Sequence, residues 1–508
     1  MSNFQNFHIA LKCDTGLDQR VYNVPTTTEI AAIWVDENDG SAIHTPHLQI
    51  YTHSDKTQRV NYYFGCYDPL QYPLLFPHGQ SGWHCGIKKL PKPENIPRSR
   101  TLEFEQLPNI KKFTSVDGYL DMEAQNLQKR KRKRDVVSVR EYYCYKLQMR
   151  NNDEDEILHT GRLFQQYSVD EYIKLETQRL DFVSFNQDLF RMGGPRDMRQ
   201  RYMDAIALVQ RFRKPDLFIT MTCNLSWTEI KEQLWSTDEA QNRPDLITRV
   251  FRAKIEELKT DILKRNIFGK VVAFMYTVEF QKRGLSHAHI LIILGNKHKL
   301  LTAEAYDDII RAELPDGKAE PDLRKIVIKH MMHGPCVYRR RNTGEVVKVR
   351  EQYLDNSWVV PYNPYLLGKF NCHINVEVCS DIKVVKYLYK YICKGHDKIA
   401  FCVQNNDTDI EIDEVKEYRS ARWVSPPKAV WRLFGFPISE MTPSVYRLQL
   451  HLEGQQFVSF KSNADIHTIV NNPMIQKTML TEFFYMNNTD EDAKELNLLY
   501  KEFPEYFV

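Results

Sequence analysis

Apolar residues recur at helical spacing in four segments in the middle of the chain. The segments 138–150, 171–185 and 198–211 place apolar residues three and four positions apart, which is typical of a helix with one buried face. Residues 247–262 show the same spacing, and Gly269 follows where such a helix can end. These patterns predict four amphipathic helices.

Short apolar runs between and after these helices predict strands. LFITMT (217–222) lies between Lys-Pro-Asp and Cys-Asn, as a short buried strand should. VVAFMYTVEF (271–280) and HAHILIIL (287–294) form a second pair of runs. They are separated by QKRGLS (281–286), a short connection containing glycine that suits a hairpin between adjacent antiparallel strands.

The pattern continues with a helix around 306–313, a strand CHINVEV at 372–378 and a helix at 381–394. The complete order is β-α-β-β-α-β-α. It predicts an α+β protein built on a ferredoxin-like or RRM-like palm, in which helices cover one face of an antiparallel sheet. Upstream, the aromatic-rich segments 31–35 and 60–67 are strand-like and belong to a separate N-terminal module.

Length and composition limit the class of protein. A chain of 508 residues suggests about three domains of roughly 100 to 200 residues each. Its 42% hydrophobic and 27% charged residues are globular values, and no apolar run approaches the roughly 20 residues of a membrane span. Lys12 and Asp14 fall where a signal peptide would be apolar. We therefore expect a globular protein that is neither secreted nor embedded in a membrane.

Cysteine and charge usage add two further expectations. The ten cysteines include no C-x-x-C pair, so neither a zinc ribbon nor a thioredoxin-type site is predicted, and reduced thiols in an intracellular protein fit best. The net charge of +3 is too small to indicate nucleic-acid binding by itself. Six consecutive basic residues, however, must be exposed, and they suit a solvated linker as well as a nuclear-import or DNA-phosphate patch: Lys129, Arg130, Lys131, Arg132, Lys133 and Arg134.

A candidate metal site lies in the predicted hairpin. His287 and His289 are two residues apart on a strand, so both imidazoles project from one face while Ala288 points into the opposite layer. Glu279 ends the preceding strand and can reach the same face as a third ligand. Mixed nitrogen and oxygen ligands suit magnesium or manganese acting on phosphate, with zinc as an alternative. An H-x-H pair alone is more often two surface or hydrogen-bonded histidines.

A second constellation lies in the helix predicted at 381–394. Tyr387 and Tyr391 are one turn apart and share a face, as do Lys390 and Lys394. Taken alone, this is an amphipathic helix with tyrosines at the edge of the core. Together with a divalent ion, this helix suggests a mechanism in which a tyrosine oxygen attacks a phosphodiester. The positive charge of nearby lysines would help the tyrosine to lose its proton. The covalent phosphotyrosine would retain the energy of the bond, so rejoining would require no ATP.

These motifs resemble those of the rolling-circle replication initiators with a His-hydrophobic-His motif, specifically the Helitron transposases of eukaryotes. KPDLFITMTCN, VVAFMYTVEFQKRGLSHAHILIIL and CHINVEVCSDIKVVKYLYKYICKGHDK are similar to the family's first, metal and two-tyrosine motifs, in the family's order. The resemblance implies an endonuclease that nicks and joins single-stranded DNA in the nucleus. It makes His287, His289 and Glu279 ligands of magnesium or manganese, and Tyr387 and Tyr391 the nucleophiles.

The resemblance also implies partners and a division of the chain. Single-stranded DNA is the expected partner, with Lys282, Arg283 and the basic run as DNA-binding residues, and a helicase-bearing Helitron protein is a further partner. The predicted parts are an N-terminal module (1–128), a basic linker (129–135), a Helitron helicase-like domain (136–298), a tyrosine-helix half (299–400) and a C-terminal region (401–508) that would lead toward a helicase.

The chain departs from the family pattern at two places. The family has a cysteine-rich stretch between an HGPC and a YRRR segment, whereas here His333–Cys336 runs almost directly into Tyr338–Arg341. No G-x-x-x-x-G-K-[ST] loop is present for a helicase. A catalytically degenerate, transposon-derived protein that binds single-stranded DNA is therefore the alternative. An RNA-binding palm ranks last, because the strands lack its paired aromatics.

Overall fold

The computed structural model describes most of the central region of the chain. Side chains are described for residues 60–90, 136–150, 156–179, 203–280, 285–333, 343–349, 351–379, 424–445 and 477–507, together with Leu48, Arg341 and short stretches within 448–456. For 180–185, 194–202 and several short strands, only the course of the backbone is described.

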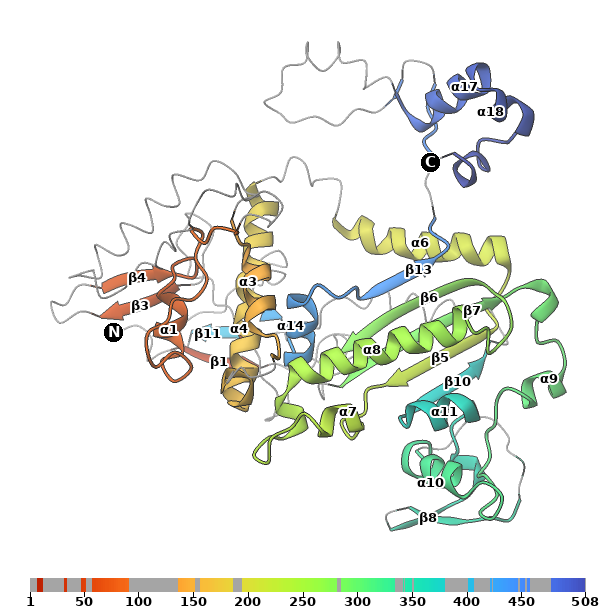
Figure 1. Ribbon diagram of the computed structural model, residues 1–508, viewed down its shortest axis with the longest axis horizontal. Helices are drawn as coiled ribbons and strands as arrows, with labels where there is room; N and C mark the ends of the chain where they lie inside the picture. Colours follow the sequence, from red (N-terminus) through yellow and green to blue (C-terminus); the bar gives the residue numbers. More distant parts are fainter. Residues whose placement is uncertain are drawn as a thin grey trace, which may run out of the picture.

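An antiparallel five-stranded sheet forms the centre of the molecule (Figure 1). Its order is β10 (Ile374–Val378), β5 (Leu217–Thr222), β7 (Ser286–Leu294), β6 (Val271–Phe280) and β13 (Ser439–Thr442), and every neighbouring pair is antiparallel. The predicted α+β class with an antiparallel sheet is confirmed. The fifth strand, β13, comes from a region in which the sequence predicted no strand.

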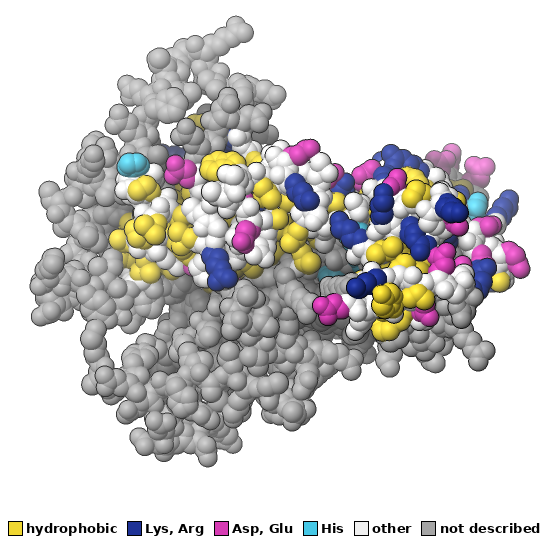
Figure 2. Space-filling model, turned by 90° about the horizontal axis from the view of Figure 1, so that it is seen from below, with side chains coloured by type: hydrophobic (Ala, Val, Ile, Leu, Met, Phe, Trp, Pro, Cys, Tyr) yellow, Lys and Arg dark blue, Asp and Glu magenta, His cyan; other side chains and the backbone are white. Residues whose placement is uncertain are grey.

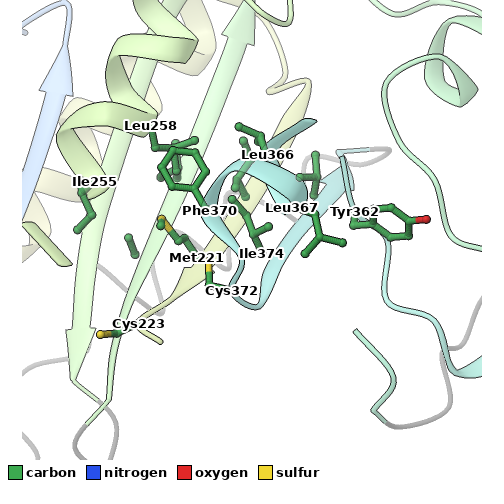
Figure 3. Close-up of a cluster of buried hydrophobic side chains, with 14 of the residues drawn as sticks. Met221, Cys223, Ile255, Leu258, Tyr362, Leu366, Leu367, Phe370, Cys372 and Ile374 are labelled. Carbon is green, nitrogen blue, oxygen red and sulfur yellow. The ribbon is translucent and has the colours of Figure 1, made fainter. Parts of the chain in front are cut away.

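One face of this sheet packs against two helices, α8 (Pro244–Leu263) and α11 (Pro364–Phe370). Side chains alternate along each strand, so every second residue of the sheet enters this core. Figure 3 shows the edge of the cluster, where Met221 and Ile374 from the sheet lie near Leu258 of α8. Helix α8 matches the predicted segment 247–262 with one additional turn at its start, where Pro244 occupies the first helical turn.

Within the described part of the chain, helix α6 (Gly194–Phe212) covers the opposite face of the sheet. Leu208 of α6 belongs to a smaller core that also contains Met275 of β6 and Leu291 of β7. In Figure 1, α6 crosses above the sheet near β13, on the side away from α8. The predicted palm had helices on one face only; the structure has helices on both faces.

The connection between β7 and β10 differs from its prediction. A helix was expected around 306–313, but the chain forms a short helix α9 (Ala303–Asp307) and a longer helix α10 (Pro321–His330). Thr302 and Pro321 explain these starts, since a threonine side chain caps α9 and proline suits the first turn of α10. A small hairpin and α11 follow before β10. The hairpin consists of β8 (Val347–Val349) and β9 (Gln352–Leu354). The helix predicted at 381–394 lies outside the described residues.

A second core lies beside the sheet and is built mainly from helices. It joins α3 (Val139–Lys146), α4 (Arg162–Phe185) and α14 (Pro426–Leu433) to the segment 72–85, which follows α1 (Tyr67–Gln71). Its members come from both sides of the boundaries predicted at 128–136 and 400. The division of the chain into domains stays a prediction.

The segment 60–67, expected to be strand-like, is mostly a turn followed by a helix. Strand β4 (Thr57–Asn61) ends near its start, a turn follows, and α1 begins at Tyr67. The amide of Phe64 donates to the carbonyl of Asn61, and the aromatic side chains pack together. The aromatic residues of this segment are buried, but they lie in a turn and at the start of a helix instead of in a strand.

The remaining elements are short. Three two-stranded pairs comprise β1 (Phe7–Leu11) with β11 (Phe401–Asn405), β2 (Ala32–Ile33) with β12 (Ala421–Arg422), and β3 (His47–Tyr51) with β4. Helix α7 (Thr228–Lys231) follows β5, and α17 (Met479–Thr489) and α18 (Glu491–Leu496) lie near the C-terminus. No helix in the described part combines the length and apolar character needed to cross a membrane.

The helical core contains a buried charge cluster. Lys174 of α4 pairs with Asp68 of α1 and donates to Glu171 at 2.8 Å, and the three side chains are at most 2% exposed. Tyr143 of α3 donates to Asp68 at 2.8 Å. Burial, together with the charge of Asp68, raises the pKa of Glu171 well above its usual range. Lys174 therefore ties α1 to α4 and compensates two buried carboxyl groups.

Replacing Lys174 by methionine should destabilise the protein by about 3 to 5 kcal/mol, because it leaves buried carboxyl groups without their cation. Urea unfolding should show a lower midpoint with an unchanged slope. The matched control is Lys325→Met, whose side chain is 77% exposed and pairs only with exposed Asp322. This control should cost less than about 0.5 kcal/mol. Equal midpoints for the two variants would contradict the structural role of Lys174.

Candidate metal centre on the central sheet

Polar side chains form two rows across the sheet, on the face that also carries α6. In the first row, Thr222 of β5 lies opposite His287 of β7, which lies opposite Glu279 of β6. In the second row, His289 lies between Thr220 and Thr277. Directly paired residues project from the same face of a sheet. Both rows therefore gather polar groups at one end of the sheet, next to the apolar contacts of α6.

The histidines point away from the main core, as the alternation predicted. Ala288, between them, is fully buried in the core beneath α8. The rings of His287 and His289 are nearly parallel, at an interplanar angle of 11° and a centroid distance of 6.5 Å. Phe218 stacks on His289 with an interplanar angle of 7°, so the apolar cluster borders this ring directly.

Glu279 and His289 form the closest pair of the site. The distance from Glu279 Oε2 to His289 Nε2 is 2.9 Å, and the two side chains are 11% and 7% exposed. A carboxylate and an imidazole at this separation share a proton when no cation is bound. Because metal ions bind the deprotonated nitrogen, an ion and this proton compete for the same position.

Two threonines of β5 contact the imidazoles from the other side. Thr220 Oγ1 lies 3.1 Å from His289 Nδ1, and Thr222 Oγ1 lies 2.9 Å from His287 Nδ1. The spacing T-x-T on β5 thus matches the spacing H-x-H on β7. In both cases the hydroxyl contacts Nδ1. This leaves Nε2 as the nitrogen that a metal ion would use on this face.

The structure adds a third histidine that the sequence analysis did not select. His373 lies just before β10, and its Nδ1 is 3.1 Å from the same Thr222 Oγ1 that contacts His287. Its ring lies 4.6 Å from that of His333, centroid to centroid. Burial, followed by repulsion from His333, His287 and His330, lowers the pKa of His373 to about 3. The period-two pattern of CHINVEV, which places His373 and Asn375 on one face, was the signal that could have found it.

The donor set fits a hard divalent cation in its chemistry. One carboxylate and two imidazoles are oxygen and nitrogen ligands suited to manganese, magnesium or zinc. The 2.9 Å between Glu279 Oε2 and His289 Nε2 is also about the separation of two adjacent ligands with bonds of roughly 2.1 Å. His287 shares their face but does not converge on them. Accordingly, the described residues contain no group of three or more His, Cys, Asp or Glu side chains arranged to hold an ion.

Other predicted site residues lie outside the described residues. These are Tyr387, Tyr391, Lys390 and Lys394 of the tyrosine segment, Lys282 and Arg283 of the hairpin connection, and the basic run 129–134. On the face seen in Figure 2, Lys and Arg side chains gather toward one end of the described surface, with Asp and Glu side chains among them. Charge on that described surface is mixed.

An antiparallel sheet with a histidine pair beside a carboxylate defines an α+β protein with a candidate metal centre. Comparison with known families places the chain more closely. Residues 191–292, which span α6 through most of β7, match the family model described as the Helitron helicase-like domain at the N-terminus. This match supports the Helitron relation that the motifs predicted, and it does so for residues 191–292. Among curated proteins, none matches the chain.

The low pKa of His373 predicts a pH dependence of stability. In the unfolded chain this histidine binds a proton below about pH 6.5, whereas in the folded protein it stays neutral down to about pH 3. The unfolded state thus binds more protons in this window, so stability is lost as the pH falls. Lowering the pH from about 7.5 to about 5.5 should cost about 1 kcal/mol through this residue.

Urea unfolding of the wild type and of His373→Asn at both pH values measures this contribution. The variant should lose less stability than the wild type over the same interval, by about 1 kcal/mol. Equal losses in the two proteins would show that His373 titrates normally in the folded state.

Proposed function

We propose that the chain is a metal-dependent nuclease and strand transferase for single-stranded DNA, acting as a rolling-circle initiator through a 5′-phosphotyrosine intermediate. The observation that carries the proposal is the registered row of Thr222, His287 and Glu279, with the carboxylate 2.9 Å from His289 Nε2. Imidazole, carboxylate and hydroxyl groups share one sheet face within a region that matches the Helitron helicase-like domain.

The strand order supports a ferredoxin-like or RRM-like palm as the scaffold. Strand β7 is inserted between β5 and β6, which makes those two strands parallel and joined through α8. Likewise β5 is inserted between β7 and β10. Two split β-α-β units that interlock in this way are the arrangement of that fold. Such a sheet brings its first and third strands together at the centre, where Thr222 and His287 lie.

The residues of the site have distinct roles in this proposal. Glu279, His289 and His287 would hold magnesium or manganese, and such an ion supplies Lewis-acid polarisation of a phosphodiester. A tyrosine oxygen forms a bond to phosphorus while the bond from phosphorus to the 3′ oxygen breaks. The phenol loses its proton and the departing 3′ oxygen gains one, so that a free 3′ hydroxyl remains.

The tyrosines of the proposal, Tyr387 and Tyr391, follow β10 in the chain. β10 runs antiparallel to β5, so its last residue, Val378, pairs with Leu217, at the opposite end of β5 from Thr222. Five residues of strand separate the two ends, about 17 Å. A helix over 381–394 that runs back along the sheet would carry residue 391 about 15 Å toward the site. Lys390 and Lys394 would then lower the cost of ionising the phenol.

The first test of this proposal is the covalent adduct. Purified protein is incubated with manganese and a pool of single-stranded oligonucleotides of random sequence that carry a fluorophore at the 3′ end. Because the protein would become attached to the 5′ phosphate, the labelled 3′ fragment should migrate with the protein under denaturing conditions. His287→Ala should abolish the adduct, and chelation of the metal should do the same.

The matched control for this experiment is His78→Ala, which removes an exposed histidine far from the sheet in sequence and should leave the adduct unchanged. Salt-sensitive binding of the oligonucleotides without any adduct would select the alternative, a degenerate protein that binds single-stranded DNA through phosphate contacts. A fully active His287→Ala would remove the metal assignment.

The two tyrosines should divide the work. In the helix predicted at 381–394, one turn would separate them by roughly 6 Å, so only one hydroxyl could lie in line with a bound phosphate at a time. Tyrosine-to-phenylalanine substitution at one position should block nicking. At the other position it should spare nicking and impair complete strand transfer. Both steps are measured on one labelled donor strand with an unlabelled acceptor. Equal loss of nicking in Tyr387→Phe and Tyr391→Phe would contradict this division.

Partners and location follow from the same proposal. Single-stranded DNA is the substrate, with Lys282, Arg283 and the basic run as phosphate contacts. The basic run also supports import into the nucleus, where transposon DNA lies. A helicase-bearing Helitron protein would supply strand separation.

A further inference from the structure

The two threonines of β5 connect the candidate metal centre to the neighbouring strands. Each lies directly opposite one histidine of β7 in the strand register, and each hydroxyl contacts the Nδ1 atom of that histidine, at 3.1 Å for Thr220 and 2.9 Å for Thr222. The T-x-T spacing therefore presents one hydroxyl to each imidazole of the H-x-H pair. Thr222 differs from Thr220 because its hydroxyl also contacts Nδ1 of His373, at 3.1 Å.

The tautomer of each imidazole decides whether it can bind an ion. A neutral imidazole carries its proton on one nitrogen and a lone pair on the other. An imidazole that binds metal through Nε2 must keep the proton on Nδ1, and the partner of Nδ1 fixes both that tautomer and the ring orientation. A threonine hydroxyl can accept such a proton, because its oxygen has two lone pairs.

We propose that Thr220 and Thr222 are positioning residues that accept the Nδ1 protons of His289 and His287 and so direct both Nε2 lone pairs to the ion. His373 completes the arrangement: the Thr222 hydroxyl, having accepted from His287, donates its own hydrogen to Nδ1 of His373. This inference rests on the proposed metal-dependent function and adds the residues that prepare the ligands.

The position and neutral state of His373 allow this direction of donation. Its Nδ1 lies within hydrogen-bond distance of Thr222, and its Nε2 is buried with no hydrogen-bond partner among the described residues. Burial keeps the ring neutral, so one of its two nitrogens is an acceptor. The main-chain amide of Thr222 also donates to the carbonyl of His373 at 2.9 Å, which holds the two residues side by side. Threonine and histidine are thus fixed by backbone pairing before any ion binds.

The experiment measures manganese affinity of the full chain by isothermal titration calorimetry. Thr222→Val keeps the shape of the side chain and removes the hydroxyl, and it should weaken manganese binding by about 10- to 100-fold. Thr222→Ser restores the hydroxyl and should recover most of the affinity. Thr260→Val is the matched control, since its hydroxyl bonds only a carbonyl within α8 on the other side of the sheet. Its manganese affinity should equal that of the wild type.

A second readout needs no metal. Nitrogen-15 spectra of labelled histidine in the metal-free protein report the tautomer of His287, which should carry its proton on Nδ1 in the wild type and in Thr222→Ser. In Thr222→Val that preference should be lost. The folded state of each variant is checked by its unfolding midpoint.

The outcomes separate this inference from the function on which it rests. Wild-type binding of manganese with equal affinity in Thr222→Val, or a wild-type His287 protonated on Nε2, overturns the positioning role and leaves the metal-dependent function standing. Absence of manganese binding in the wild type overturns the metal-dependent function, and the positioning role with it.

Discussion

The antiparallel register of β5, β7 and β6 is the constraint on which the site depends. Side chains alternate between the two faces of a sheet, so a shift of one residue would turn His287 and His289 into the main core and expose Ala288. The fully buried residues Ile290 and Ile292 prevent such a shift, because it would move them out of the core beneath α8. Apolar packing on one face of the sheet thus fixes the positions of the polar side chains on the other face.

The polar rows lie where the apolar cover of α6 ends. At His289, Phe218 packs against the ring while Glu279, from the neighbouring row, reaches its Nε2 atom. Partial burial strengthens each hydrogen bond and raises the cost of an unpaired polar atom. The threonine hydroxyls of β5 give Nδ1 of both histidines a hydrogen-bond partner, so neither atom is left unpaired. The same partners that satisfy the buried imidazoles therefore orient them.

The helical core and the sheet use polar groups for different purposes. In the helical core, Lys174, Asp68 and Glu171 are almost completely buried and compensate one another, which links helices far apart in sequence. In the sheet, His289 and Glu279 remain slightly exposed and share a position that an ion can take. The first set is closed around its own charges, whereas the second belongs to the candidate metal centre.

The sequence by itself determined the local features of this protein. Apolar spacing predicted the helix at 247–262 and the three strands of the β-α-β-β segment around it. The H-x-H spacing placed both imidazoles on one face. These patterns depend only on the 3.6- and two-residue periods of helix and strand. The ordered motifs also predicted the Helitron relation. Apart from the predicted hairpin of β6 and β7, only the tertiary structure decided which strands are neighbours. It brought Thr222 and His373 to His287 and added β13 to the sheet, because contacts between residues distant in sequence leave no periodic trace in any one segment.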